Sequence, residues 1–79
     1  MSPEQMFLLR AEALAISGVS MAALDRAAAD AAIRATLRAL GGVRNCVAAF
    51  AHEFGEHPDI TAERMRGARR VVAHLYGGD

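Results

Sequence analysis

The sequence predicts an all-α fold, a compact bundle of four short helices in a single domain covering residues 1–79. Alanine, the best helix former, is abundant, and apolar residues recur at three- and four-residue intervals in four stretches separated by glycine-containing connections. The expected helices are about residues 3–17, 21–40, 43–54 and 61–76. An antiparallel bundle is the natural packing for helices joined by short connections, and a looser orthogonal arrangement is the alternative.

The first expected helix, residues 3–17, has a clear start. Ser2 and Gln5 have the spacing of a capping box, and Pro3 suits the first helical position. Too many apolar residues then follow in succession to face one small core. This surplus predicts an interface with a partner protein or a second copy, and the alternative is that the helix is wedged between the other three. The residues concerned are Met6, Phe7, Leu8 and Leu9.

The longest helical pattern, residues 20–40, is expected to be the helix around which the others pack. Ser20 is its predicted N-cap, and Gly41-Gly42 predicts its end. Asp25 falls inside the apolar arc. Such a carboxylate either benefits from the nearby helix N-terminus or is a charge at a helix or subunit contact, paired with an arginine. The opposite side is expected to be a solvated charged stripe of Arg26, Asp30, Arg34 and Arg38.

The third expected helix, residues 43–54, carries a stripe with helical spacing that predicts a core face. Cys46 lies on this stripe and is expected to be a small buried hydrophobe rather than a reactive thiol. Gly55 predicts the end of the helix, and Asp59 or Thr61 is expected to cap the last one. Gly67, in the middle of that helix, suggests a close helix crossing. The stripe consists of Val43, Cys46, Val47, Phe50 and Phe54.

The composition predicts a marginal core. A chain of this length buries only about 60–65% of the surface that its unfolded state exposes. Apolar residues make up 53% of the sequence, but many are alanine and none is tryptophan. A small core with few large side chains favours an oligomer.

The totals also limit the classes of chemistry and of location. A single cysteine excludes an internal disulfide and any multi-cysteine metal site within one chain. The formal net charge of zero offers no general attraction to nucleic acid or membrane. No signal peptide and no membrane span are expected, so a cytoplasmic location is the default. All nine basic residues are arginine, which, with so much alanine and glycine, suggests a bacterial or phage origin.

Two histidines and two glutamates between His52 and His57 raise the question of a zinc site. A zincin helix needs two histidines four residues apart, and here they are five apart. The inverted motif also fails, because Glu56 lies four residues after His52. We expect a polar helix end here, with no metal and no cofactor.

Two features keep nucleic acid open as an alternative partner. The turn at Gly18, with Leu14, Val19 and Leu24, loosely has the spacing of a helix-turn-helix element, although Met21, Ala22 and Ala23 are poor readers of bases. The last helix concentrates positive charge that could meet phosphate, an acidic protein or a second copy. Arginine near a helix C-terminus also complements the helix dipole. This basic face consists of Arg64, Arg66, Arg69 and Arg70.

These patterns favour a small non-enzymatic regulator, adaptor or inhibitor that occupies the surface of another protein, as a homodimer through its first helix. No catalytic set is expected, because the three serines lie at predicted caps or turns. The alternative is a nucleic-acid-binding regulator that uses the arginine-rich last helix or the element around Gly18. Neither function requires a cofactor or a membrane.

Overall fold

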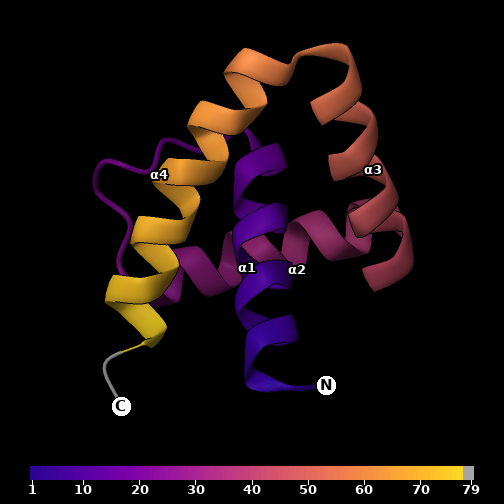
Figure 1. Cartoon of the computed structure of the whole chain (residues 1–79). Helices are drawn as coiled ribbons and strands as arrows, with labels where there is room; N and C mark the ends of the chain where they lie inside the picture. The colour runs from indigo at the N-terminus through magenta and orange to yellow at the C-terminus, as the bar shows by residue number, and fades with distance from the viewer. Residues whose placement is uncertain (78–79) are drawn as a thin grey trace.

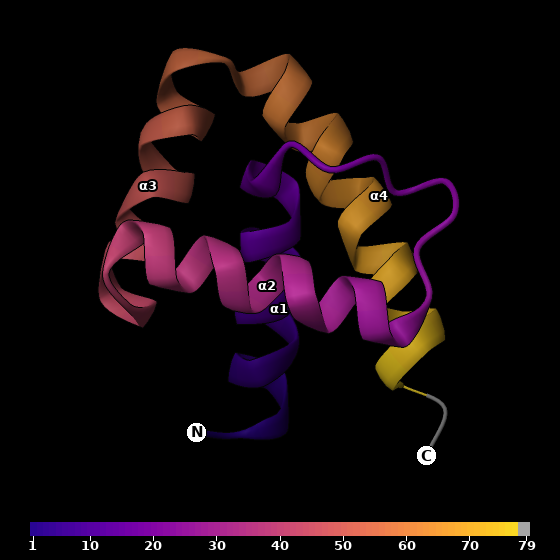
Figure 2. The same cartoon turned by 180° about the vertical axis from the view of Figure 1, so that it is seen from behind.

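Residues 1–77 are described by the computed structural model and form four α-helices and no strand. The helices are α1 (Pro3–Ser17), α2 (Arg26–Leu40), α3 (Val43–Glu56) and α4 (Pro58–Tyr76). They build a compact bundle with a Cα radius of gyration of 11.5 Å (Figure 1). The all-helical prediction is confirmed. The bundle is not uniformly antiparallel, because α2 lies across α1 while α4 runs back beside it (Figure 2).

The central helix is α1, so the expectation that residues 20–40 organise the fold is wrong. α1 packs against α2, α3 and α4. The physical reason is its small side chains, which let three helices approach one axis and cover an apolar helix on several sides. The wedged arrangement therefore describes the second half of α1. Five of the eleven buried apolar residues within 1–77 belong to this helix: Leu9, Ala11, Ala13, Leu14 and Ala15.

The connection between α1 and α2 is longer than the sequence predicted. Gly18 ends α1 with a φ of 80°, and α2 begins only at Arg26. Asp25, not Ser20, is the N-cap, since its carboxylate accepts a hydrogen bond of 2.7 Å from the backbone N–H of Ala28. Both residue types cap well. The intervening segment instead packs apolar side chains against the core, which overrides the helix propensity of its alanines: Val19, Met21 and Leu24.

This long connection removes two further expectations. A helix-turn-helix motif joins its helices by a turn of three or four residues, whereas residues 18–25 separate α1 from α2. The geometry therefore lends no support to such an element around Gly18. Gly67 does not mark a helix crossing either. The nearest neighbour of a Cβ built there is the sulfur of Met21 in the connection, at 3.5 Å.

The junction of α3 and α4 is shorter than predicted. α3 continues through Gly55 to Glu56, and a single residue, His57, precedes α4. Pro58 starts α4 because its fixed φ suits the first turn and its missing N–H would have no partner there. The expected caps at Asp59 and Thr61 are therefore wrong. The Thr61 hydroxyl instead donates to the Glu53 carbonyl at 3.2 Å, which ties α4 to the end of α3.

α3 and α4 are arranged as an inverted V that straddles α1 (Figure 1). Near the apex both helices lie close to α1, where Ala11 and Ala15 are 0% and 3% exposed. Toward the N-terminal end of α1 the helices diverge, and Leu8 on the same side of α1 is 42% exposed. α2 covers the opposite side of α1 (Figure 2). The open end of the V is thus the place where α1 is least covered.

Candidate protein-interaction surface

Large exposed apolar residues occur at both ends of the V: Phe54 and Ile60 lie near its apex, and a larger group lies at its open end. Four of them, two from α3 and two from the N-terminal end of the chain, line one hollow between α1 and α3 with a volume of about 390 Å³. Leu9, Gln5 and Glu12 complete its lining. The four are Met1, Leu8, Val43 and Val47, exposed by 69%, 42%, 42% and 46%.

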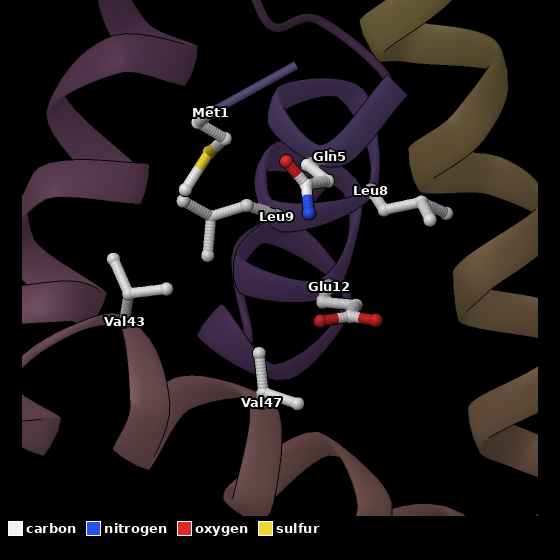
Figure 3. A pocket seen from close by; sticks show the side chains of 7 residues that line it. All are labelled: Met1, Gln5, Leu8, Leu9, Glu12, Val43 and Val47. Atoms are coloured by element: carbon white, nitrogen blue, oxygen red, sulfur yellow. The ribbon is translucent and has the colours of Figure 1, made fainter. Parts of the chain in front are cut away.

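The α3 wall of the hollow comes from the stripe that the sequence assigned to the core. Only Cys46 is fully buried, and Phe50 is half-buried. Val43 and Val47 lie one turn apart and point toward α1 across the hollow (Figure 3). Phe54, further along the helix, is also exposed. The expected core stripe is therefore too wide: α1 covers one edge of it and leaves the other open.

Glu12 gives this apolar hollow its one ionisable side chain. Its side chain extends from α1 beside Val47 (Figure 3) and is half-buried. Burial raises the pKa of the Glu12 carboxyl, because the ionised form loses hydration. Burial, followed by the charge of Glu12, also raises the pKa of the Cys46 thiol. A buried thiol with a raised pKa is a poor nucleophile, as expected for a structural cysteine.

A second hollow lies on the other side of Leu8, between α1 and α4. Pro3, Glu4 and Phe7 line it together with Arg69, whose guanidinium carbon lies 6.0 Å from the centre of the Phe7 ring. Leu8 therefore forms a ridge between two hollows. The surface around Leu8 is therefore built by α3 and α4 as well as by α1.

The residues predicted to form an interface on the first helix divide into two groups. Met6 and Leu8 are exposed, at 36% and 42%, whereas Phe7 is half-buried and Leu9 is 7% exposed. Leu9 thus belongs to the core and forms only the floor of the α1–α3 hollow. Asp25 lies elsewhere, exposed at the start of α2. Its capping bond explains the position of this acid: Asp25 precedes α2 and does not interrupt the apolar face of the helix.

The structure also divides the predicted basic face. Arg64 points back to α1, where its Nε donates to the carbonyl of Ala15 at 2.6 Å and its terminal nitrogen lies 3.3 Å from the carbonyl of Val19. The Ala15 carbonyl belongs to the last turn of α1 and lacks a partner within the helix, whereas Val19 follows the helix. The guanidinium therefore caps α1, complements its dipole and also holds the start of the connection. The other three arginines of the predicted basic face, Arg66, Arg69 and Arg70, are exposed.

Sequence reasoning missed a polar cluster at the end of α4. The Tyr76 hydroxyl donates to Asp30, and the guanidinium carbons of Arg10 and Arg26 lie 4.1 and 4.8 Å from the centre of its ring. Burial, then the bond to Asp30 and its charge, raise the pKa of Tyr76 to about 12 against the opposing effect of the arginines. The only feature of the sequence that points to this cluster is Arg10, an arginine in the otherwise mostly apolar first helix. The cluster joins α1, α2 and α4.

His52, Glu53 and Glu56 are exposed near the end of α3, and His57 is exposed at the junction with α4. Within residues 1–77, no group of three or more histidine, cysteine, aspartate or glutamate side chains is arranged to hold a metal ion. No helix in that range has the length and apolarity needed to cross a bilayer. Comparison with models of known families, with curated proteins and with solved structures finds no match, so function has to be inferred from the surface itself.

Proposed function

We propose that this chain is a small non-enzymatic cytoplasmic regulator, adaptor or inhibitor that acts by binding another protein. The observation that supports this is the hollow between α1 and α3, where four exposed apolar side chains from two helices lie together. Contiguous apolar surface of this kind is characteristic of protein-binding sites on soluble domains. A helix presenting an apolar ridge would fit between two diverging helices.

The same hollow gives little support to catalysis. Its lining offers one ionisable side chain, that of Glu12, beside the amide of Gln5 and five apolar side chains. Acid–base or nucleophilic catalysis generally needs two or three interacting groups, such as a nucleophile, a base and a residue that orients it. The surface therefore favours a binding role.

Site-specific photo-crosslinking in the cells of origin tests this proposal. A photoreactive side chain replaces Val47, in the hollow, and in a matched variant Arg38, on the exposed side of α2. We expect a discrete cross-linked protein from the Val47 position and none from the Arg38 position. Cross-links from neither position, or the same products from both, would contradict a protein-binding role for the hollow.

A nucleic-acid-binding regulator is the second candidate, supported by the exposed arginines of α4. Arg66 and Arg70 lie one turn apart, but Asp59 and Glu63 are exposed on the same helix and reduce its positive charge. Binding through phosphates would weaken steeply with salt. Fluorescence anisotropy with DNA and RNA oligonucleotides should then show salt-dependent binding that is lost in an Arg66→Glu, Arg70→Glu variant. Binding that survives this change would exclude these arginines as the site.

A further inference from the structure

The lining of the hollow between α1 and α3 defines the chemistry of an occupant that would fit it. Its walls are apolar, so an occupant must present an apolar ridge. Glu12 lies half-buried among them, and desolvation is the cause of its raised pKa, with no contribution from a neighbouring cation. A partner that covered this carboxylate without pairing it would add to the desolvation cost. The fitting occupant therefore carries a cation directly beside its apolar ridge.

The exposed face of α3 has this chemistry. Val43 and Val47 are 42% and 46% exposed and lie one turn apart. Arg44 is exposed and follows Val43 directly, which places it about 100° around the helix, on the flank of the valine ridge. The helix that forms one wall of the hollow thus also presents the surface that the hollow requires. Self-complementarity of this kind is the property of an interface with two-fold symmetry.

We propose that the hollow between α1 and α3 binds α3 of a second copy of this chain, with Arg44 of each copy paired to Glu12 of the other. A two-fold axis near Val43 and Val47 makes the two α3 helices antiparallel and places one α1 on each side of them. The valines of both copies then fill the apolar space beside Leu8, and the ion pair is made twice. The carboxylate that is uncompensated in one copy gains its cation from the other.

This inference rests on the protein-binding role proposed for the hollow, since it names a second copy of this chain as the protein bound there, and it assigns a register to the pairing. It differs from an interface formed by the apolar residues of α1 alone, because α3 supplies the ridge and the cation. Met6 lies outside the hollow and plays no part. The charge pair makes the proposal testable without disturbing the core, because Arg44 is exposed and Glu12 is half-buried.

Light scattering combined with gel filtration, over roughly micromolar to millimolar protein, is the test. We expect the wild type to reach twice the chain mass of 8.4 kDa. Glu12→Arg brings guanidinium groups together across the interface, and Arg44→Glu brings carboxylates together. Each change should weaken dimerisation by roughly 100-fold, since like charges across an interface cost several kcal/mol. Glu63→Arg and Arg38→Glu, at exposed positions of α4 and α2, are matched controls that should dimerise like the wild type.

Mixing the two variants identifies the pair. In a heterodimer of the E12R and R44E chains, both contacts join opposite charges, so the equimolar mixture should recover the wild-type dimer although each variant alone is monomeric. Circular dichroism of each variant confirms that it is folded. A wild type that stays monomeric, single variants that still dimerise, or a mixture that does not recover would each overturn the inference. A monomeric wild type whose Val47 position still cross-links to a different protein would leave the proposed function standing.

Discussion

Arg64 allows a direct test of how α4 is fastened to α1. Its Nε–H donates to the carbonyl of Ala15 at 2.6 Å, with longer contacts of 3.3 and 3.5 Å to Val19 and Leu14. Arg64→Met keeps most of the aliphatic stem and removes every donor. A hydrogen bond to a charged group contributes about 1.5–3 kcal/mol, and the longer contacts and the helix dipole add a few tenths each. We expect the free energy of unfolding to fall by about 2–3 kcal/mol.

Urea unfolding followed by circular dichroism measures this loss, at protein concentrations low enough to keep the chain monomeric. A domain of this length has a total stability of roughly 4–12 kcal/mol, so the thermal midpoint should also drop by about 10–20 °C. Arg66→Met is the matched control, because Arg66 lies on the exposed side of the same helix. It should change the free energy of unfolding by less than about 0.5 kcal/mol. Equal losses in both variants would refute the capping role of Arg64.

Three further predictions concern local features of the fold. Asp25→Ala should lower the free energy of unfolding by about 0.5–2 kcal/mol, because it removes the cap of α2, whereas Ser20→Ala should have little effect. Equal effects of the two changes in urea titrations would show that Asp25 is not the cap. Gly18→Ala should lower the free energy of unfolding by about 1–2 kcal/mol, since φ is 80° at Gly18. Gly67→Ala should raise it by about 0.5–1 kcal/mol, because a Cβ there makes only ordinary contact with its neighbour. Calorimetry showing the reverse order would contradict the assigned conformations. Tyr76 has a raised pKa of about 12, so the contribution of its hydroxyl to the free energy of unfolding is complete below pH 10 and is lost as the pH rises through 12. Over this range the free energy of unfolding of the wild type should therefore fall more steeply than that of Tyr76→Phe. Parallel pH profiles of the two proteins would argue against the bond to Asp30.

Features encoded by neighbouring residues could be predicted from the sequence. The capping box at Ser2 and Gln5 forms as expected, with both bonds present at 2.9 and 3.1 Å. Gly41 ends α2 with a φ of 88°, also as expected, and its N–H donates to carbonyls of the last turn. Such signals need no knowledge of the rest of the chain, because their partners lie within one turn.

Features that depend on packing could not be predicted. Ser20 and Asp25 are both good caps, and the alanines between them favour a helix, so only the burial of Met21 and Leu24 against the core decides where α2 begins. Helical spacing likewise identified a stripe on α3 without showing how much of it a neighbour would cover. Val47 therefore became part of the hollow instead of the core.

The candidate site has one feature that could be predicted from neighbouring residues and others that depend on packing. The surplus of apolar residues around Leu8 was visible in the sequence, because four in succession exceed what one face can bury. The pairing of that residue with α3, and the placement of Glu12 between them, depends on how α3 and α4 diverge over α1. Sequence spacing places Arg64 with the other arginines for a similar reason, since its partners are carbonyls about fifty positions away in the chain.

The pairing of the first helix with the last has a consequence for how the protein is synthesised. Leu14 of α1 and Val72 of α4 belong to the same core, and translation of the residues between them takes roughly 3–12 s at about 5–20 residues per second. During that interval nascent α1 has only α2 and α3 to cover it. The domain can complete its core only after α4 has left the ribosomal tunnel. We therefore expect ribosome-bound chains to stay protease-sensitive until α4 has emerged from the tunnel, with the leucines of α1 accessible to chaperones until then.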